Sequence, residues 1–81
     1  MDKFIAHILV VDDDGGIRSL VKKYLNEYNF LVSTANSAED ASEKISIIKF
    51  DLIILDIMMP GKNGLEFIKD HKKNWILLLF F

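Results

Sequence analysis

Two patterns of apolar residues alternate along the chain: short continuous runs and stripes of helical period. The continuous runs occupy residues 7–11, 30–35, 52–55 and 75–81. Runs of this length that are rich in branched and aromatic residues are typical of strands buried on both faces. The run at 30–35 is less apolar than the others, so we expect its strand to lie near an edge of the sheet.

Segments of helical period separate these runs. From Ile17 to Tyr28, apolar residues recur at i, i+3, i+4, i+7, i+8 and i+11, which predicts an amphipathic helix that Asp14 caps. Ser37 followed by Asp40 resembles a capping box and predicts the start of a second helix. The buried stripe of this second helix is expected to be Ala38, Ala41, Ile45 and Ile48. A third helix is predicted from about residue 64 to residue 73.

The resulting order is β-α-β-α-β-α-β. Each connection is long enough for a right-handed parallel crossover, which favours an α/β sheet with helices on both faces. No linker, repeat or low-complexity tract interrupts the chain, so residues 1–81 are expected to form one unit.

Two of the predicted strands end in acidic residues. Asp12 and Asp13 follow the first strand, and Asp56 follows the third. If these strands are neighbours, the three carboxylates converge at the carboxyl edge of the sheet, where open α/β folds bind ligands. Like charges repel there, which protonation of one acid would relieve. A hard divalent cation suits the cluster better, because oxygen-only ligands without His or Cys favour Mg²⁺ or Mn²⁺. One carboxylate oxygen would remain free to attack a phosphoryl group.

Composition narrows the functional classes. The formal net charge is −2 and the ten Lys and Arg residues are dispersed, so no nucleic-acid surface is indicated. Cysteine is absent, which excludes disulfides and thiolate metal sites and suits a cytoplasmic protein. No signal peptide is apparent, and the run of seven residues at 75–81 is too short for a membrane-spanning helix, which needs about 20 residues.

The motifs "ILVVDDD" and "DLIILDIMMPGKNG", some forty residues apart, resemble the receiver domain of two-component response regulators. The resemblance runs from about Ala6 onward. It implies a flavodoxin-like, doubly wound parallel sheet with strand order 2-1-3-4-5. It also implies a cytoplasmic signalling domain that is not an enzyme beyond forming its own acyl phosphate, and whose phosphoryl donor is a histidine kinase.

The resemblance assigns roles to individual residues. Asp56 matches the phosphoacceptor, Asp13 the direct Mg²⁺ ligand, and Asp12 the acid that holds the metal through water. The backbone carbonyl of Met58 matches the remaining protein ligand. Asp14 matches a helix-capping acid. Among the turn residues, Pro60 and Gly61 shape the loop, and Gly64 matches a close backbone approach before the third helix.

Other interpretations of the same residues fit less well. An acid at a strand end is often only a cap, but three such acids with the loop motif favour the functional interpretation. A P-loop NTPase would require a G-x-x-x-x-G-K-[ST] loop, which the sequence lacks. A haloacid-dehalogenase-type phosphatase would require an acid at the position of Met58. His7 and His71 are interpreted as structural or solvent-facing residues.

The sequence departs from the family in its last third. The family has five βα units, whereas three units and one strand are predicted here, so the expected fold is incomplete and the receiver domain C-terminally truncated. Phe80 stands where the family places a Ser or Thr, and the family's fifth-strand Lys has no counterpart. The alternative is therefore a non-signalling remnant or fragment that acts only as an interaction module. The apolar run from Trp75 to Phe81 is expected to promote self-association.

Overall fold

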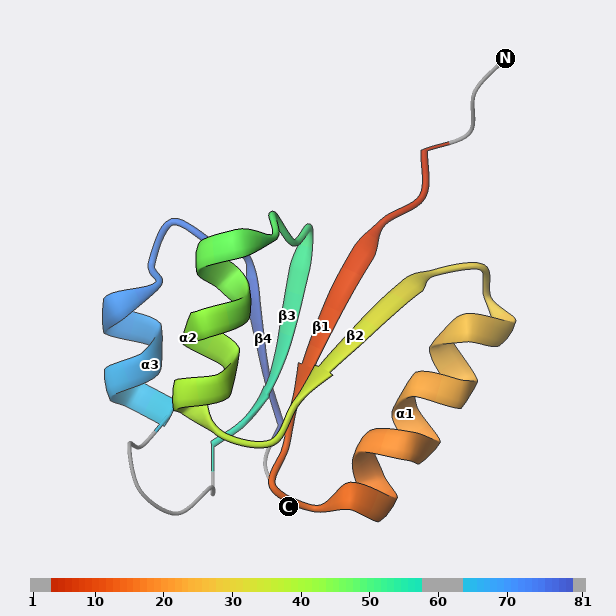
Figure 1. The fold of residues 1–81 in the computed structure, drawn as a ribbon, viewed down its shortest axis with the longest axis horizontal. Helices are drawn as coiled ribbons and strands as arrows, with labels where there is room; N and C mark the ends of the chain where they lie inside the picture. Colours follow the sequence, from red (N-terminus) through yellow and green to blue (C-terminus); the bar gives the residue numbers. More distant parts are fainter. Residues whose placement is uncertain (1–3, 58–63, 80–81) are drawn as a thin grey trace.

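The computed structural model describes residues 4–57 and 64–79, and these form a four-stranded sheet with helices on both faces (Figure 1). The elements in chain order are β1 (His7–Val11), α1 (Gly15–Glu27), β2 (Leu31–Ala35), α2 (Ala38–Ile47), β3 (Leu52–Asp56), α3 (Gly64–Asp70) and β4 (Ile76–Leu79). This confirms the predicted alternation of strands and helices.

The strands lie in the order β2-β1-β3-β4, and every neighbouring pair is parallel. The order agrees with the first four positions of the flavodoxin-like sheet that the resemblance implied. As expected from its sequence, β2 lies at an edge. Val11 of β1 pairs with both Ala35 of β2 and Leu55 of β3, so these three residues lie at the same level near the carboxyl ends of their strands.

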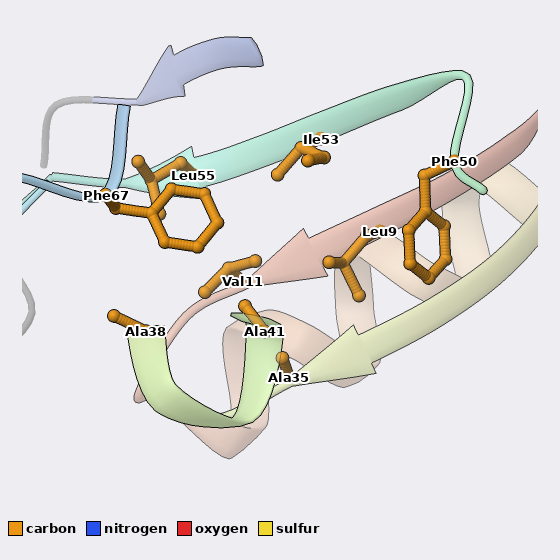
Figure 2. Packing of buried hydrophobic residues seen from close by; sticks show 9 residues of the cluster. All are labelled: Leu9, Val11, Ala35, Ala38, Ala41, Phe50, Ile53, Leu55 and Phe67. Carbon is orange, nitrogen blue, oxygen red and sulfur yellow. The ribbon is translucent and has the colours of Figure 1, made fainter. Parts of the chain in front are cut away.

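Alternate residues of the strands face two separate apolar cores. Helices α2 and α3 cover one face, and α1 covers the other (Figure 1). Under α1, Val21 and Leu25 pack against a cluster that includes Val10 and Ile54. The larger core lies under α2 and α3 and is shown in Figure 2; it consists of Leu9, Val11, Ala35, Ala38, Ala41, Phe50, Ile53, Leu55 and Phe67.

The predicted helix starts are confirmed by their capping contacts. The Asp14 carboxylate accepts hydrogen bonds from the backbone N–H groups of Gly16 and Ile17, at 2.8 and 3.1 Å. The Ser37 hydroxyl accepts one from the Asp40 N–H at 3.0 Å. The capping box differs in its return contact, because the Asp40 carboxylate accepts from the N–H of Asn36 and not from that of Ser37.

Several element boundaries differ from the sequence prediction. Helix α3 ends at Asp70, three residues before the predicted limit, because a turn follows in which the His71 carbonyl accepts from the Asn74 N–H at 2.9 Å. Strand β4 begins at Ile76, and Trp75 before it is 80% exposed. Strand β3 extends one residue further than predicted and includes Asp56.

The apolar stripe of α1 is only partly buried. Val21 and Leu25 contact the sheet, whereas Leu20, Tyr24 and Tyr28 are 68%, 58% and 60% exposed. The exposed residues are spaced by four and form a second row beside the buried one. The stripe is therefore wider than the contact that α1 makes with the described part of the sheet.

Candidate metal and phosphoacceptor site

The two strand ends bring the predicted acids together. Val11 pairs with Leu55, so the next residues along the parallel strands, Asp12 and Asp56, lie side by side at the carboxyl edge. Asp12 and Asp56 are 2% and 7% exposed, while Asp13 is exposed. Oxygen atoms from these three carboxylates lie within 4.8 Å of one another. The convergence expected from the sequence is thus present in the fold.

The backbone around Asp12 is held at several points. Its N–H donates to the Ala35 carbonyl of β2 at 3.1 Å. Its Oδ1 accepts from the Asp14 N–H at 2.9 Å. Its carbonyl accepts from the Arg18 guanidinium at 2.7 Å. Hydrogen bonds to β2, to Asp14 and to α1 therefore restrain the connection between β1 and α1 at Asp12.

The electrostatics of the pocket disfavour three ionised carboxylates. Burial of Asp12 raises the pKa of its carboxyl above the ordinary value of 3.8, against the lowering effect of the hydrogen bond from Asp14. The charge of Asp56, a side-chain hydrogen bond with Asp56 and the charge of Asp13 raise the pKa further. A bound cation would remove this penalty, because it favours the charged form of each carboxylate.

The donor set fits Mg²⁺. All three groups are carboxylates, and hard divalent cations prefer such oxygen ligands to nitrogen or sulfur. The cluster mixes buried and exposed members, which leaves one side of the site toward solvent, and Mg²⁺ commonly retains several waters. The predicted fourth ligand, the carbonyl of Met58, lies outside the described residues, as do Pro60 and Gly61.

Both histidines have structural surroundings away from this pocket, as predicted. The His7 Nε2 lies 2.8 Å from the Ser33 hydroxyl, and its ring packs edge-on against Phe50. The His71 Nε2 lies 2.8 Å from the Ser42 hydroxyl, and its ring packs beside Phe67.

Sequence reasoning missed Arg18. It lies on the first turn of α1, and its side chain reaches back to the carbonyl of Asp12. The available signal was a cation four residues after the capping Asp14 and six residues after Asp12. Charged residues at that spacing are common on exposed helices, so this signal alone does not identify a contact.

Residues 8–78 match the model of the family described as "Response regulator receiver domain". The chain belongs to this family. The match covers both strand-end motifs and the site built from them, so the resemblance seen in the sequence is confirmed.

Curated relatives of this receiver domain include proteins described as transcriptional regulators. The chain is 45% identical over 64 residues to Protein PetR of Rhodobacter capsulatus, covering 79% of this chain and 27% of PetR. It is 40% identical over 75 residues to transcriptional regulatory protein ResD of Bacillus subtilis, covering 89% of this chain and 31% of ResD. The chain thus spans less than a third of the length of these two relatives.

Solved receiver structures share the fold of this domain. Response regulator TrrA of Thermotoga maritima, in complex with Mg²⁺-BeF, is 42% identical with a TM-score of 0.85, covering 94% of this chain and 70% of TrrA. Chemotaxis response regulator CheY4 of Vibrio cholerae is 34% identical with a TM-score of 0.87, covering 93% of this chain and 68% of CheY4. Within the described residues of this receiver domain, no helix has the length and apolar character needed to cross a membrane.

Proposed function

We propose that this receiver domain accepts a phosphoryl group on Asp56 from the phosphohistidine of a histidine kinase. In this proposal Mg²⁺ is held by Asp12, Asp13, Asp56 and the backbone carbonyl of Met58. The observation that carries the proposal is the meeting of three carboxylates, with oxygens within 4.8 Å of one another, at the shared end of β1 and β3.

The reaction is a displacement at phosphorus. A carboxylate oxygen of Asp56 forms a new P–O bond as the P–N bond of the donor's phosphohistidine breaks. The imidazole leaves with the electron pair of that bond and takes up a proton from solvent. Bound Mg²⁺ supplies positive charge that offsets the charge of the acids and of the transferring oxygens.

The positions of the acids suit these separate roles. Asp56 ends a strand whose preceding residue, Leu55, is fully buried, so its backbone is anchored at the edge of the sheet. Asp12 is buried beside it, while Asp13 is exposed and therefore accessible to a hydrated ion. A nucleophile held by a rigid strand loses little orientational freedom on reaction.

Two solved structures of one relative support the choice of cation and donor. TrrA of Thermotoga maritima has been solved in complex with Mg²⁺-BeF and also in complex with histidine kinase ThkA. The chain is 42% identical to TrrA in both structures. By this similarity we extend the same class of cation and of protein partner to the present receiver domain.

The proposal includes the setting in which the domain works. Residues 1–81 act as one receiver unit in the cytoplasm, they carry out no catalytic turnover beyond their own phosphorylation, and they do not contact nucleic acid directly. The competing hypothesis is an interaction module that retains the acid pocket without phosphorylation.

One experiment separates these hypotheses. The chain is incubated with Mg²⁺ and acetyl phosphate, and its intact mass is measured. We expect a phosphoryl mass increment that requires Mg²⁺ and is lost in Asp56→Asn. Glu43→Gln is the matched control, because it removes one exposed negative charge from α2, away from the site. No increment in the parent would favour the competing hypothesis, and an increment that persists in Asp56→Asn would show that a residue other than Asp56 accepts the phosphoryl group.

A further inference from the structure

Arg18 connects α1 to the loop that carries the metal-binding acids. This loop, residues 12–14, is called the acid loop below. The Arg18 backbone N–H donates to the Asp14 carbonyl at 3.0 Å, and its Nη1 donates to the Asp12 carbonyl at 2.7 Å. A single residue therefore holds both ends of the acid loop.

The carbonyl that Arg18 binds controls the direction of Asp13. It belongs to the planar peptide unit that joins Asp12 to Asp13, so fixing this oxygen fixes the plane from which Asp13 begins. Within the described residues, no hydrogen bond holds the Asp13 carboxylate itself. The position of that carboxylate therefore depends on the backbone of the acid loop.

The other polar groups of Asp12 are already bonded within the protein. Its N–H binds the Ala35 carbonyl and its Oδ1 binds the Asp14 N–H. The first contact fixes the backbone at the end of β1 and the second closes a turn over Asp13, while the contact from Arg18 restrains the carbonyl of the Asp12–Asp13 peptide. A guanidinium donor is always charged and makes shorter, stronger hydrogen bonds than a neutral donor.

The path of the Arg18 side chain is also defined by packing. The side chain is half-buried, and its guanidinium lies across the first turn of α1, where a Cβ added at Gly15 would come within 3.5 Å of Nη2. The guanidinium therefore lies beside the helix start and does not extend freely into solvent.

We propose that Arg18 is a positioning residue that orients the acid loop so that Asp12 and Asp13 together bind Mg²⁺. The proposal rests on the proposed function, because it assumes that the three acids form the metal site. It adds a role for a residue that touches neither the metal nor the phosphoryl group.

The test compares Arg18→Met with Lys22→Met. Lys22 lies one turn further along α1, is exposed and makes no hydrogen bond within the described residues. Both variants replace a cation with an unbranched apolar side chain of similar helix propensity, so they match in charge and in helix stability. The measurements are the Kd for Mg²⁺ by titration calorimetry and the Tm without Mg²⁺.

We expect Arg18→Met to weaken Mg²⁺ binding about tenfold, as is typical when a group that orients a metal ligand is lost. The Kd of Lys22→Met for Mg²⁺ should stay within about twofold of the parent's, because the exposed charge of Lys22 is screened by solvent and salt. Arg18→Lys should recover part of the affinity, since it restores a cationic donor. A purely structural role would lower the Tm without Mg²⁺ and leave the Kd unchanged.

Two results would overturn the proposal: Arg18→Met binding Mg²⁺ as tightly as the parent, or Lys22→Met losing as much affinity as Arg18→Met. If Arg18→Met does not melt cooperatively, Arg18→Leu is measured by the same criteria. A parent that binds Mg²⁺ but is not labelled by acetyl phosphate refutes only the phosphoacceptor function. A parent that does not bind Mg²⁺ refutes the metal site and the role of Arg18 with it.

Discussion

Removing one charge from the acid cluster should stabilise the fold when Mg²⁺ is absent. The proposed change is Asp56→Asn, which keeps the size of the side chain and removes its charge. The carboxylate oxygens concerned lie within 4.8 Å of one another. At 4.8 Å, two unit charges repel by about 3.5 kcal/mol at an effective dielectric of about 20, and by about 0.9 kcal/mol in bulk water.

The buried pair of Asp12 and Asp56 lies between these limits, and the raised pKa of Asp12 relieves part of the repulsion by favouring its neutral form. We therefore expect Asp56→Asn to raise the free energy of unfolding by about 1–2 kcal/mol without Mg²⁺. For a domain of this size, each kcal/mol corresponds to about 4–8 °C in Tm.

The same variant should respond less to the metal. At a free concentration ten times the Kd, Mg²⁺ should stabilise the parent by about 1.4 kcal/mol. Asp56→Asn has lost one of the three carboxylate ligands, so its gain should be less than half of this.

Urea unfolding of both proteins, with and without millimolar Mg²⁺, measures both effects, and Glu43→Gln controls for the loss of an exposed charge. The reasoning fails if Asp56→Asn is no more stable than the parent without Mg²⁺ while Mg²⁺ leaves the parent unchanged. That outcome would mean that the acids do not interact in solution as they do in the structure.

Other predictions concern pH, labelling rate, association and capping. Burial and the neighbouring acids raise the pKa of Asp12 above 3.8, so the folded protein holds that proton more tightly than the unfolded chain. Without Mg²⁺, this contribution to stability is therefore largest below pH 3.8 and is lost as pH rises through the raised pKa. In urea unfolding measured across pH, the free energy of unfolding of Asp12→Asn should fall less over this range than that of the parent. Labelling by acetyl phosphate should be slow, because the resemblance places Phe80 where the family has a hydroxyl group; rapid stoichiometric labelling in a quenched time course would contradict this. Leu77 is 49% exposed on β4, an outer strand of the described sheet, so Leu77→Lys should reduce association in sedimentation, whereas the control Leu20→Lys on α1 should not. Ser37→Ala should cost about 1 kcal/mol in urea unfolding, because the Asp40 N–H loses its capping partner; a cost near zero would show that solvent replaces the cap.

The sequence was sufficient to predict the sheet and the acid cluster because both depend on local patterns. A continuous apolar run must lie between two helical layers, and the acid that follows it is placed at the edge by the end of the strand. Asp12 and Asp56 therefore lie side by side because β1 and β3 are neighbours in the sheet. The order of those strands came from the family resemblance and was not evident in the residues alone.

Other features depend on contacts that no periodic pattern records. The contact from Arg18 to Asp12 joins a helix to a loop, and the type of residue does not reveal where a long side chain ends. The apolar pattern of α1 likewise includes Leu20 and Tyr24, because periodicity indicates which residues share a side of the helix but not how much of that side is covered. The end of α3 at Asp70 was set by a turn and not by a breaker residue.

The central claim is that Asp56 is the residue that receives the phosphoryl group, and its direct test is to locate the acyl phosphate. After incubation with Mg²⁺ and acetyl phosphate, borohydride reduction converts a phosphorylated aspartate to homoserine, which peptide mass spectrometry can locate in the sequence. We predict homoserine at position 56, only in samples that contained Mg²⁺. Homoserine at Asp12 or Asp13, or none at any position, would contradict the account.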